Sequence, residues 1–161
     1  MSNLSFARAC ACLALAASLL VGGQAAALEI GQTKLFGIGV AGGYYTENLT
    51  AKYYLGNKAA IQGFLGGYNF EGLALAVDYV VEPVELAKGP AGRLFLGFGG
   101  GADFWSWSSY SSIGVHALVE LGWHFKAVPI EFVADWRPMF FFGHHDGFAG
   151  RGGHGAVRWY F

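Results

Sequence analysis

The stretch SIGVHALVELGWHF, residues 112–125, alternates between two kinds of side chain along its whole length. One set is apolar and comprises Ile113, Val115, Ala117, Val119, Leu121 and Trp123. The other set is mainly small or ionisable and comprises Gly114, His116, Leu118, Glu120, Gly122 and His124. A period of two residues is typical of a β-strand whose two faces meet different surroundings. We therefore expect a strand over 112–125 with one apolar face and one charged face.

The same alternation recurs in other parts of the chain. Ile130, Phe132, Ala134 and Trp136 alternate with Glu131, Val133, Asp135 and Arg137. Turn-forming residues separate such segments, so we expect strands near 34–43, 48–55, 58–69, 72–81, 93–105, 112–125, 129–141 and 151–161. Most of them have the length, about 9–11 residues, that a tilted strand needs to cross a bilayer.

The composition favours a barrel that turns its apolar side outward. Charged residues make up 13% of the chain and aromatic residues 17%, whereas a soluble domain carries about 25% charge. The body of the chain has no apolar run near the roughly 20 residues of a spanning helix. A closed barrel is the other structure that satisfies every backbone group in lipid. The predicted fold is all-β, a closed eight-stranded antiparallel up-and-down transmembrane β-barrel.

The N-terminus has the features of a cleavable signal peptide over 1–27, followed by the predicted barrel domain over 28–161. Arg8 supplies positive charge, residues 13–21 form a short apolar core, and the alanines at 25–27 offer a cleavage site. We therefore expect export to the outer membrane of a Gram-negative bacterium. Removal of Arg8 would leave 9 of the 10 basic residues against 11 acidic ones, a balance that indicates no nucleic-acid partner.

If the apolar residues of each strand face outward, the alternate residues face inward. This inner face carries nearly equal numbers of opposite charges. The basic groups are Lys52, Arg93, Arg137 and Arg158, and the acidic groups are Asp78, Asp103, Glu120, Glu131 and Asp135. Gln62, His116, His124 and His154 share this face. Unpaired buried charges would cost several kcal/mol each, so we predict a salt-bridge network that fills and plugs the interior. The alternative is a narrow channel for small solutes, although eight strands leave no open bore.

Glycines and connections complete the expected barrel. Inward glycines, including Gly37, Gly39, Gly97, Gly99 and Gly101, would give bulky inner neighbours room. Tight turns at 56–58 and 126–129 fit the periplasmic side, whereas the longer segments 106–112 and 143–150 would face outward. The stretch 82–92 is expected as an unusually long inner connection.

Patterns that elsewhere mark functional sites have simpler explanations here. GIGVAG at 37–42 matches the dinucleotide fingerprint, but a strand follows it in place of the required helix, so we expect no cofactor. His144, His145 and Asp146 offer metal ligands, but we expect them to be solvated in a glycine-rich loop and predict no metal. The two cysteines lie at positions 10 and 12, inside the predicted signal peptide, so cleavage removes thiol chemistry.

The last residues place Val157, Trp159 and Phe161 on one face. This pattern resembles the C-terminal signature of outer-membrane proteins, which implies recognition by the barrel-assembly machinery. Other notable stretches are LTAKYYL at 49–55 with KAAI at 58–61, AVDY at 76–79, GRL at 92–94, PIEF at 129–132 and RWYF at 158–161. Together they resemble a family of small barrels catalogued as DUF3996 and loosely called OmpA-like or OmpX-like. The resemblance implies a small membrane barrel and no enzyme.

The sequence thus predicts an integral outer-membrane protein with a charged, largely plugged interior and a structural or surface-interaction role. We expect a monomer among outer-membrane lipid and lipopolysaccharide. The alternative is a lipid-A-modifying enzyme, because lipid A deacylases are barrels that use a serine, a histidine and an acid. In that family the histidine stands two residues before the serine, and His116 and His124 lack such a serine. His116 and Glu120, four apart on one strand, are therefore expected as structural interior groups.

Overall fold

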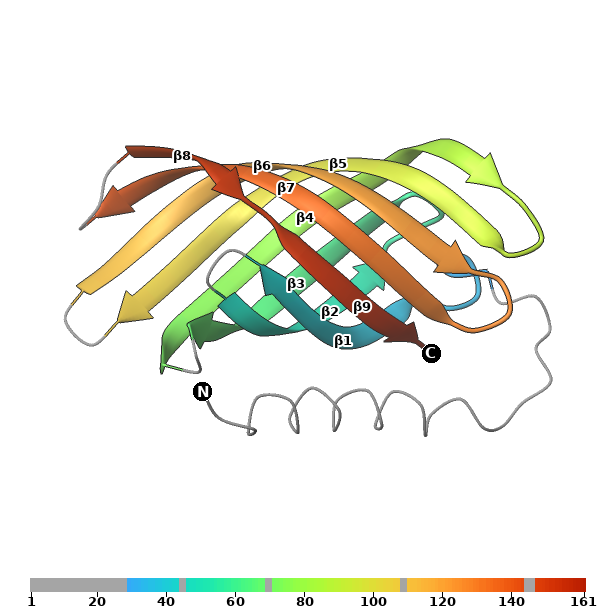
Figure 1. Ribbon diagram of the computed structural model, residues 1–161, viewed down its shortest axis with the longest axis horizontal. Coiled ribbons are helices and arrows are strands. Elements are labelled where there is room, and N and C mark those ends of the chain that lie inside the picture. Colours follow the sequence, from blue (N-terminus) through green and yellow to red (C-terminus); the bar gives the residue numbers. More distant parts are fainter. Residues whose placement is uncertain (1–28, 44–45, 69–70, 108–109, 144–146) are drawn as a thin grey trace, which may run out of the picture.

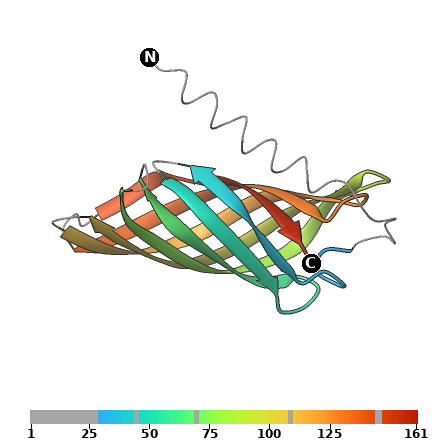
Figure 2. The same ribbon diagram turned by 90° about the horizontal axis from the view of Figure 1, so that it is seen from below.

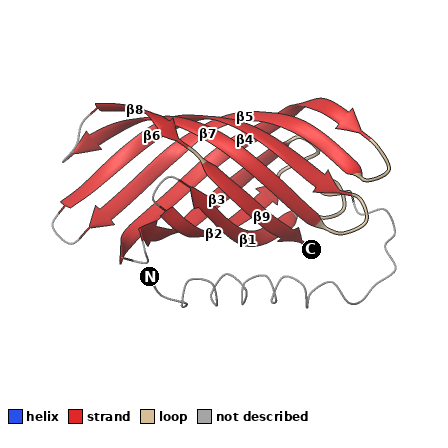
Figure 3. Ribbon diagram, viewed as in Figure 1, coloured by secondary structure: helices blue, strands red, loops and turns tan. Residues whose placement is uncertain are grey.

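The alternating segments form one antiparallel sheet in the computed structural model, which describes residues 29–43, 46–68, 71–107, 110–143 and 147–161 (Figure 1). The strands are β1 (Phe36–Gly43), β2 (Thr46–Tyr54), β3 (Ala59–Tyr68), β4 (Glu71–Lys88), β5 (Gly92–Trp107), β6 (Tyr110–Phe125), β7 (Ile130–Gly143), β8 (Gly147–Gly152) and β9 (His154–Tyr160). Figure 3 shows strands and loops only across this part of the chain. None of its segments is a helix long and apolar enough to span a membrane.

The sheet closes on itself. Each strand from β1 to β7 pairs with the next, and β1 pairs with β9 from Gly37 opposite Tyr160 to Gly43 opposite His154. β8 and β9 both pair with β7 and are separated only at Gly153, so together they form the eighth strand of the ring. Figure 2 shows the tilted strands enclosing one interior. The predicted closed eight-stranded antiparallel barrel is confirmed.

The apolar side chains point outward and the polar ones inward. On β4, Val77 is 59% exposed and Tyr79 51%, whereas Asp78 between them is 1% exposed. The same inversion holds along β6, where Ile113 and Val115 are exposed and the alternate residues are buried. A soluble barrel would show the opposite arrangement, with its polar face in water.

Several inner glycines stand where a side chain would collide with a large neighbour. A Cβ added at Gly97 would lie 2.6 Å from Glu120 Cγ, and one at Gly114 would lie 2.8 Å from Met139 Sδ. At Gly39 the collision would be with the backbone of Val157 across the β1–β9 seam. An eight-stranded interior is just wide enough for side chains, so glycine on one strand admits bulk from another.

The expected long connection over 82–92 is wrong, because β4 continues to Lys88. Glu82 and Pro83 form a bulge between the pairs Val81–Phe98 and Val84–Leu96. Proline has no N–H to donate to the ladder, so it is accommodated at such an irregularity. The Glu82 amide donates to the carbonyl of Lys58 instead. The strand then resumes, and only residues 89–91 connect it to β5.

The predicted outer loops at 106–112 and 143–150 are also largely replaced by strand. β5 reaches Trp107 and β6 begins at Tyr110, while β7 reaches Gly143 and β8 begins at Gly147. The wall formed by β4 to β7 is therefore taller than the one formed by β1 to β3, whose strands have 8, 9 and 10 residues. Figure 1 shows the β4–β5 hairpin reaching past the β2–β3 turn at the same end.

The end of the barrel that carries the tight turns holds a small apolar cluster. Residues 29–34 form a turn held by bonds from the amides of Gln32 and Thr33 to the Glu29 carbonyl. The turn places Ile30, 6% exposed, against Tyr54, Ala60 and Tyr160 inside the barrel. This contact places residues just before β1 at the turn end of the barrel interior, a feature that the sequence pattern did not predict.

Closure of the barrel at the β1–β9 seam should depend on Gly39. Gly39→Ala places a methyl group against the Val157 backbone, so we expect loss of most of the folded barrel in heat-modifiable SDS gel electrophoresis. Gly63→Ala is the matched control, since its Cβ would meet only the Ala76 carbonyl at 3.7 Å. We expect the control to change the free energy of unfolding by less than about 1 kcal/mol. Equal behaviour of the two variants would contradict the seam constraint.

Candidate functional site

The interior is the candidate site, and the structure places the predicted inner charges there. Buried side chains from all around the ring meet: Lys52, Gln62, Asp78, Asp103, His116, Glu120, His124, Glu131, Asp135, Arg137 and Arg158. The Arg93 and His154 side chains are 22% and 12% exposed, at the edges of the set. Their contacts divide into two clusters joined by Gln62.

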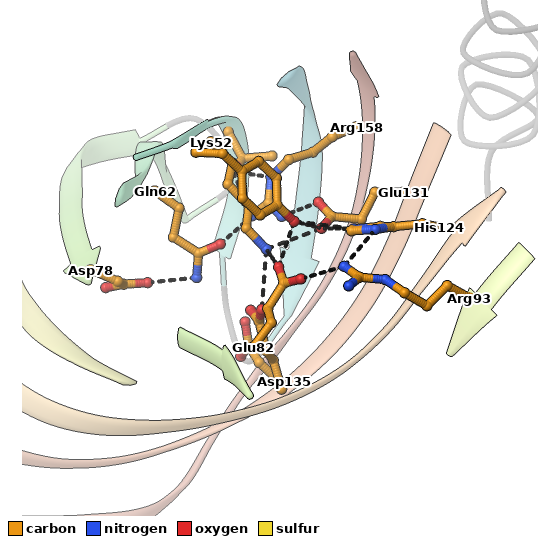
Figure 4. A network of polar contacts seen from close by, with 12 residues as sticks. Lys52, Gln62, Asp78, Glu82, Arg93, His124, Glu131, Asp135 and Arg158 are labelled. Atoms are coloured by element: carbon orange, nitrogen blue, oxygen red, sulfur yellow. Dashed lines mark hydrogen bonds and ion pairs between the residues drawn. The ribbon is translucent and has the colours of Figure 1, made fainter. Parts of the chain in front are cut away.

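The Lys52 cluster is organised around one ammonium group. Lys52 Nζ lies 2.8 Å from Glu82 Oε1, 3.1 Å from Glu120 Oε1 and 3.0 Å from Glu131 Oε1, and all four side chains are at most 1% exposed (Figure 4). Lys52 stands on β2, and its partners stand on β4, β6 and β7. None of these strands is next to β2 in the sheet. Every ion pair of Lys52 therefore crosses the interior and links strands that are not neighbours in the sheet.

A second shared group in this cluster is Glu82, which the sequence interpretation missed. Its Oε1 also accepts a bond from the Tyr54 hydroxyl, and its Oε2 lies 2.8 Å from Arg93 Nη2. The same Arg93 nitrogen is 3.1 Å from His124 Nδ1, and His124 Nε2 is 3.0 Å from Glu131 Oε1. Glu82 thus connects the central ammonium to the partly exposed arginine at the turn end.

Arg158 forms the other arm of the Lys52 cluster. Its Nη1 donates to Glu131 Oε2 at 2.8 Å, and its Nε and Nη2 donate to the Thr50 hydroxyl. Nη2 also donates to Gln62 Oε1 at 2.9 Å, while Gln62 Nε2 donates to Asp78 Oδ2 at 3.0 Å. An amide that accepts from a guanidinium and donates to a carboxylate is suited to link regions of opposite charge.

The second cluster is centred on Asp78. Arg137 Nη1 lies 2.9 Å from Asp78 Oδ2, and its Nε and Nη2 make a two-point contact with Asp135. Both ring nitrogens of His116 face carboxylates, Nδ1 at 2.5 Å from Asp103 Oδ2 and Nε2 at 2.9 Å from Asp78 Oδ1. Only a doubly protonated imidazole can donate from both nitrogens. The geometry therefore suits His116 as an additional interior cation.

Aromatic rings fill the space between the charged groups. Arg137 lies over the Phe64 ring at 4.4 Å from its centroid, and the His154 ring stacks on the Phe64 ring with 5.4 Å between the centroids. Phe95 lies 4.6 Å from the His124 ring and is completely buried. Such contacts place hydrocarbon beside the cations while leaving their hydrogen bonds in place.

The signal for Glu82 was present in the sequence, because it continues the inward alternation of Asp78 and Val80. It was missed because the strand was expected to end near residue 81 and residues 82–92 were assigned to a connection. Tyr54 and Tyr160 were missed for a different reason. They follow Lys52 and Arg158 by two residues, so the alternation places them on the inner face, but it does not show that their hydroxyls donate to buried carboxylates.

The Lys52 cluster also contains groups that ligate metals. Glu82, His124 and Glu131 bring one ligand atom each within 4.8 Å of one another. The Lys52 ammonium contacts both carboxylates of this trio, so the protein supplies a positive charge of its own at that point. Among the described residues, neither His116 nor His124 has a serine hydroxyl among its contacts, and the hydroxyl beside His124 Nε2 is that of Tyr54, at 3.1 Å.

The remaining sequence candidates lie elsewhere. The glycine pattern at 37–42 falls within β1, with no helix after it. His144, His145 and Asp146 are outside the described residues, as is the predicted signal peptide. Val157 and Phe161 are exposed on the outer face, Trp159 is half-buried between them, and whether these residues direct assembly stays a prediction.

The central position of Lys52 predicts a large stability cost when its charge is removed. Lys52→Met leaves three buried carboxylates without their shared cation, so we expect the free energy of unfolding to fall by about 3–5 kcal/mol in urea titrations in detergent micelles. Lys58→Met is the control. The Lys58 ammonium is exposed and donates to the Pro83 carbonyl at 3.4 Å, so its removal should change stability by less than about 0.5 kcal/mol. A cost of similar size in both variants would refute the role given to Lys52.

Comparisons of this chain with models of protein families, with curated proteins and with solved structures each found no match. The resemblance to small outer-membrane barrels therefore stays a prediction from the sequence, and the barrel and its interior carry the functional argument.

Proposed function

We propose that this protein is an integral barrel of the bacterial outer membrane, with a closed interior and a structural or surface-interaction role. The observation that carries the proposal is the apolar outer surface. Exposed apolar side chains occur on every side of the ring, for example Ile38 on β1, Leu65 on β3, Val77 on β4, Leu121 on β6 and Phe140 on β7. Soluble monomers rarely expose continuous apolar patches above a few hundred Å², so a belt of this kind favours lipid.

Aromatic residues at both ends of the barrel support the same orientation. Phe36, Tyr53 and Phe132 are exposed toward the end with the tight turns, and Phe142 and Phe148 toward the opposite end. Aromatic side chains are enriched at both interfaces of a bilayer. With the signal-peptide features of residues 1–27, this pattern supports export, with the tight turns in the periplasm and lipid and lipopolysaccharide around the barrel.

A structural role is favoured because many of the interior charged groups pair with one another. The side chains in the Lys52 cluster bond across the ring, and the Ile30 cluster lies beneath them at the turn end. A solute would have to separate several buried ion pairs to pass, and each broken pair carries a cost of several kcal/mol.

Membrane insertion can be tested with two single cysteines in a chain whose Cys10 and Cys12 are replaced by serine. Val77→Cys places a bimane label on the outer belt, and Asn57→Cys places it in an exposed tight turn. In lipid vesicles we expect nitroxide groups deep in the acyl chains to quench the label at 77 several-fold more than the label at 57. Equal quenching at both positions would rule out a belt buried in lipid.

Closure of the interior can be tested by electrical recording. We expect the purified protein in planar bilayers to give no stable unitary conductance at neutral pH, because ion pairs span its interior. A porin reconstituted in the same way is the positive control, since roughly 16 strands leave an aqueous channel. Reproducible, long-lived current steps from the barrel would favour the small-solute channel over the closed form.

A further inference from the structure

The end of the barrel with the tight turns contains a hollow of about 100 Å³ beside the interior network. Its charged lining comprises Glu29, Glu85, Lys88, Arg93 and Lys126. Backbone at Gly89 and Gly92, on either side of the β4–β5 turn, forms part of the wall. The hollow is therefore assembled from the taller β4–β5 hairpin, the β2–β3 turn at Asn57, the β6–β7 turn and the segment that carries Ile30.

Arg93 is held in a fixed position at this hollow. Its Nη2 is bonded to Glu82 Oε2 and lies 3.1 Å from His124 Nδ1, while its guanidinium lies over the Phe95 ring at 5.3 Å (Figure 4). Its Nε and Nη1 have no hydrogen bond to another described residue. With Nη2 engaged, the remaining N–H groups on Nε and Nη1 lie on different edges of the guanidinium, so each can donate a single hydrogen bond to an anionic oxygen.

The other charged groups of the hollow are uncommitted. Within the described parts of the chain, Lys88, Lys126, Glu29 and Glu85 form no ion pair within 4.0 Å. In the interior, by contrast, five carboxylates each contact a lysine or an arginine: Asp78, Glu82, Glu120, Glu131 and Asp135. Three cations and two carboxylates around one small hollow can receive a ligand that carries both signs. The carboxylates would repel a bare phosphate but attract an amine next to it.

We propose that this hollow binds a phosphate group that carries a neighbouring amine, as in phosphoethanolamine. Arg93, Lys88 and Lys126 contact the phosphate, and Glu85 and Glu29 contact the ammonium. The ligand can be a soluble phosphoethanolamine or the headgroup of a phosphatidylethanolamine. The soluble ligand requires only the barrel, whereas the lipid form also requires the proposed membrane location.

The steric test uses two glycines in turns at the same end of the barrel. A Cβ at Gly89 or at Gly56 would meet no atom within 4 Å, so valine should be tolerated at both, but only Gly89 lines the hollow. We expect Gly89→Val to weaken binding of phosphoethanolamine at least tenfold in isothermal titration with the protein purified from membranes. Gly56→Val should leave the affinity within twofold. Equal affinities in both variants would overturn the proposal. So would an unchanged protein that binds neither phosphoethanolamine nor phosphatidylethanolamine.

The charge test separates the phosphate from the amine. The Lys88→Gln/Lys126→Gln double variant should bind phosphoethanolamine at least tenfold more weakly, with Lys58→Gln as the control. Glu85→Gln should weaken phosphoethanolamine but not inorganic phosphate. Inorganic phosphate that binds as tightly as phosphoethanolamine would overturn the need for an amine.

Native mass spectrometry then identifies the source of the ligand. Retention of phosphatidylethanolamine over phosphatidylglycerol, lost in Gly89→Val, would support the lipid form even where the free headgroup binds too weakly to measure. Equal retention of both lipids, without binding of the free headgroup, would overturn the proposal while leaving the membrane location intact.

Discussion

The constraint on which this structure depends is the enclosure of charge in a narrow ring. Six carboxylates share the interior with three guanidinium groups and one ammonium, and most of their ion pairs join residues of different strands. Lys52 pairs with its three partners only if β4, β6 and β7 present their glutamates at its own level. A shift of one residue in any of these strands would turn a glutamate to the outer face. The interior pairing therefore helps to fix the register of the whole barrel.

The same constraint explains the distribution of small and large residues. Charged side chains with several hydrogen bonds occupy more space than eight strands enclose unless some inner positions are empty, and glycines such as Gly97 and Gly101 provide that space beside Glu120 and Asp78. The outer face has no such demand and is free to carry large apolar groups. The paired charged side chains inside and the large apolar side chains outside are thus two consequences of one closed, narrow sheet.

The fold and most of the interior could be predicted because both follow from parity. The period of two along 112–125 assigns His116, Glu120 and His124 to one face without knowledge of their partners. Parity gives no account of irregularities such as the bulge at Glu82 and Pro83, so the strand was expected to end near residue 81 and Glu82 was placed in a connection. Which carboxylate meets which cation also could not be predicted, because partners such as Lys52 and Glu131 are set by ring closure. The packing of Ile30 against Tyr54, Ala60 and Tyr160 depends on the shape of this end of the closed barrel, which no local sequence pattern predicts.

The unequal height of the two walls has a consequence for any bilayer that surrounds the protein. On β4 exposed apolar residues extend from Leu73 to Leu86, whereas on β1 they extend only from Phe36 to Val40. A hydrocarbon layer of uniform thickness cannot match both, and mismatch costs fractions of a kcal/mol per Å. The lipid should thin beside β1 to β3, or the barrel axis should lean toward one side. The protein would then act as an asymmetric inclusion that favours neighbours with short acyl chains along one flank.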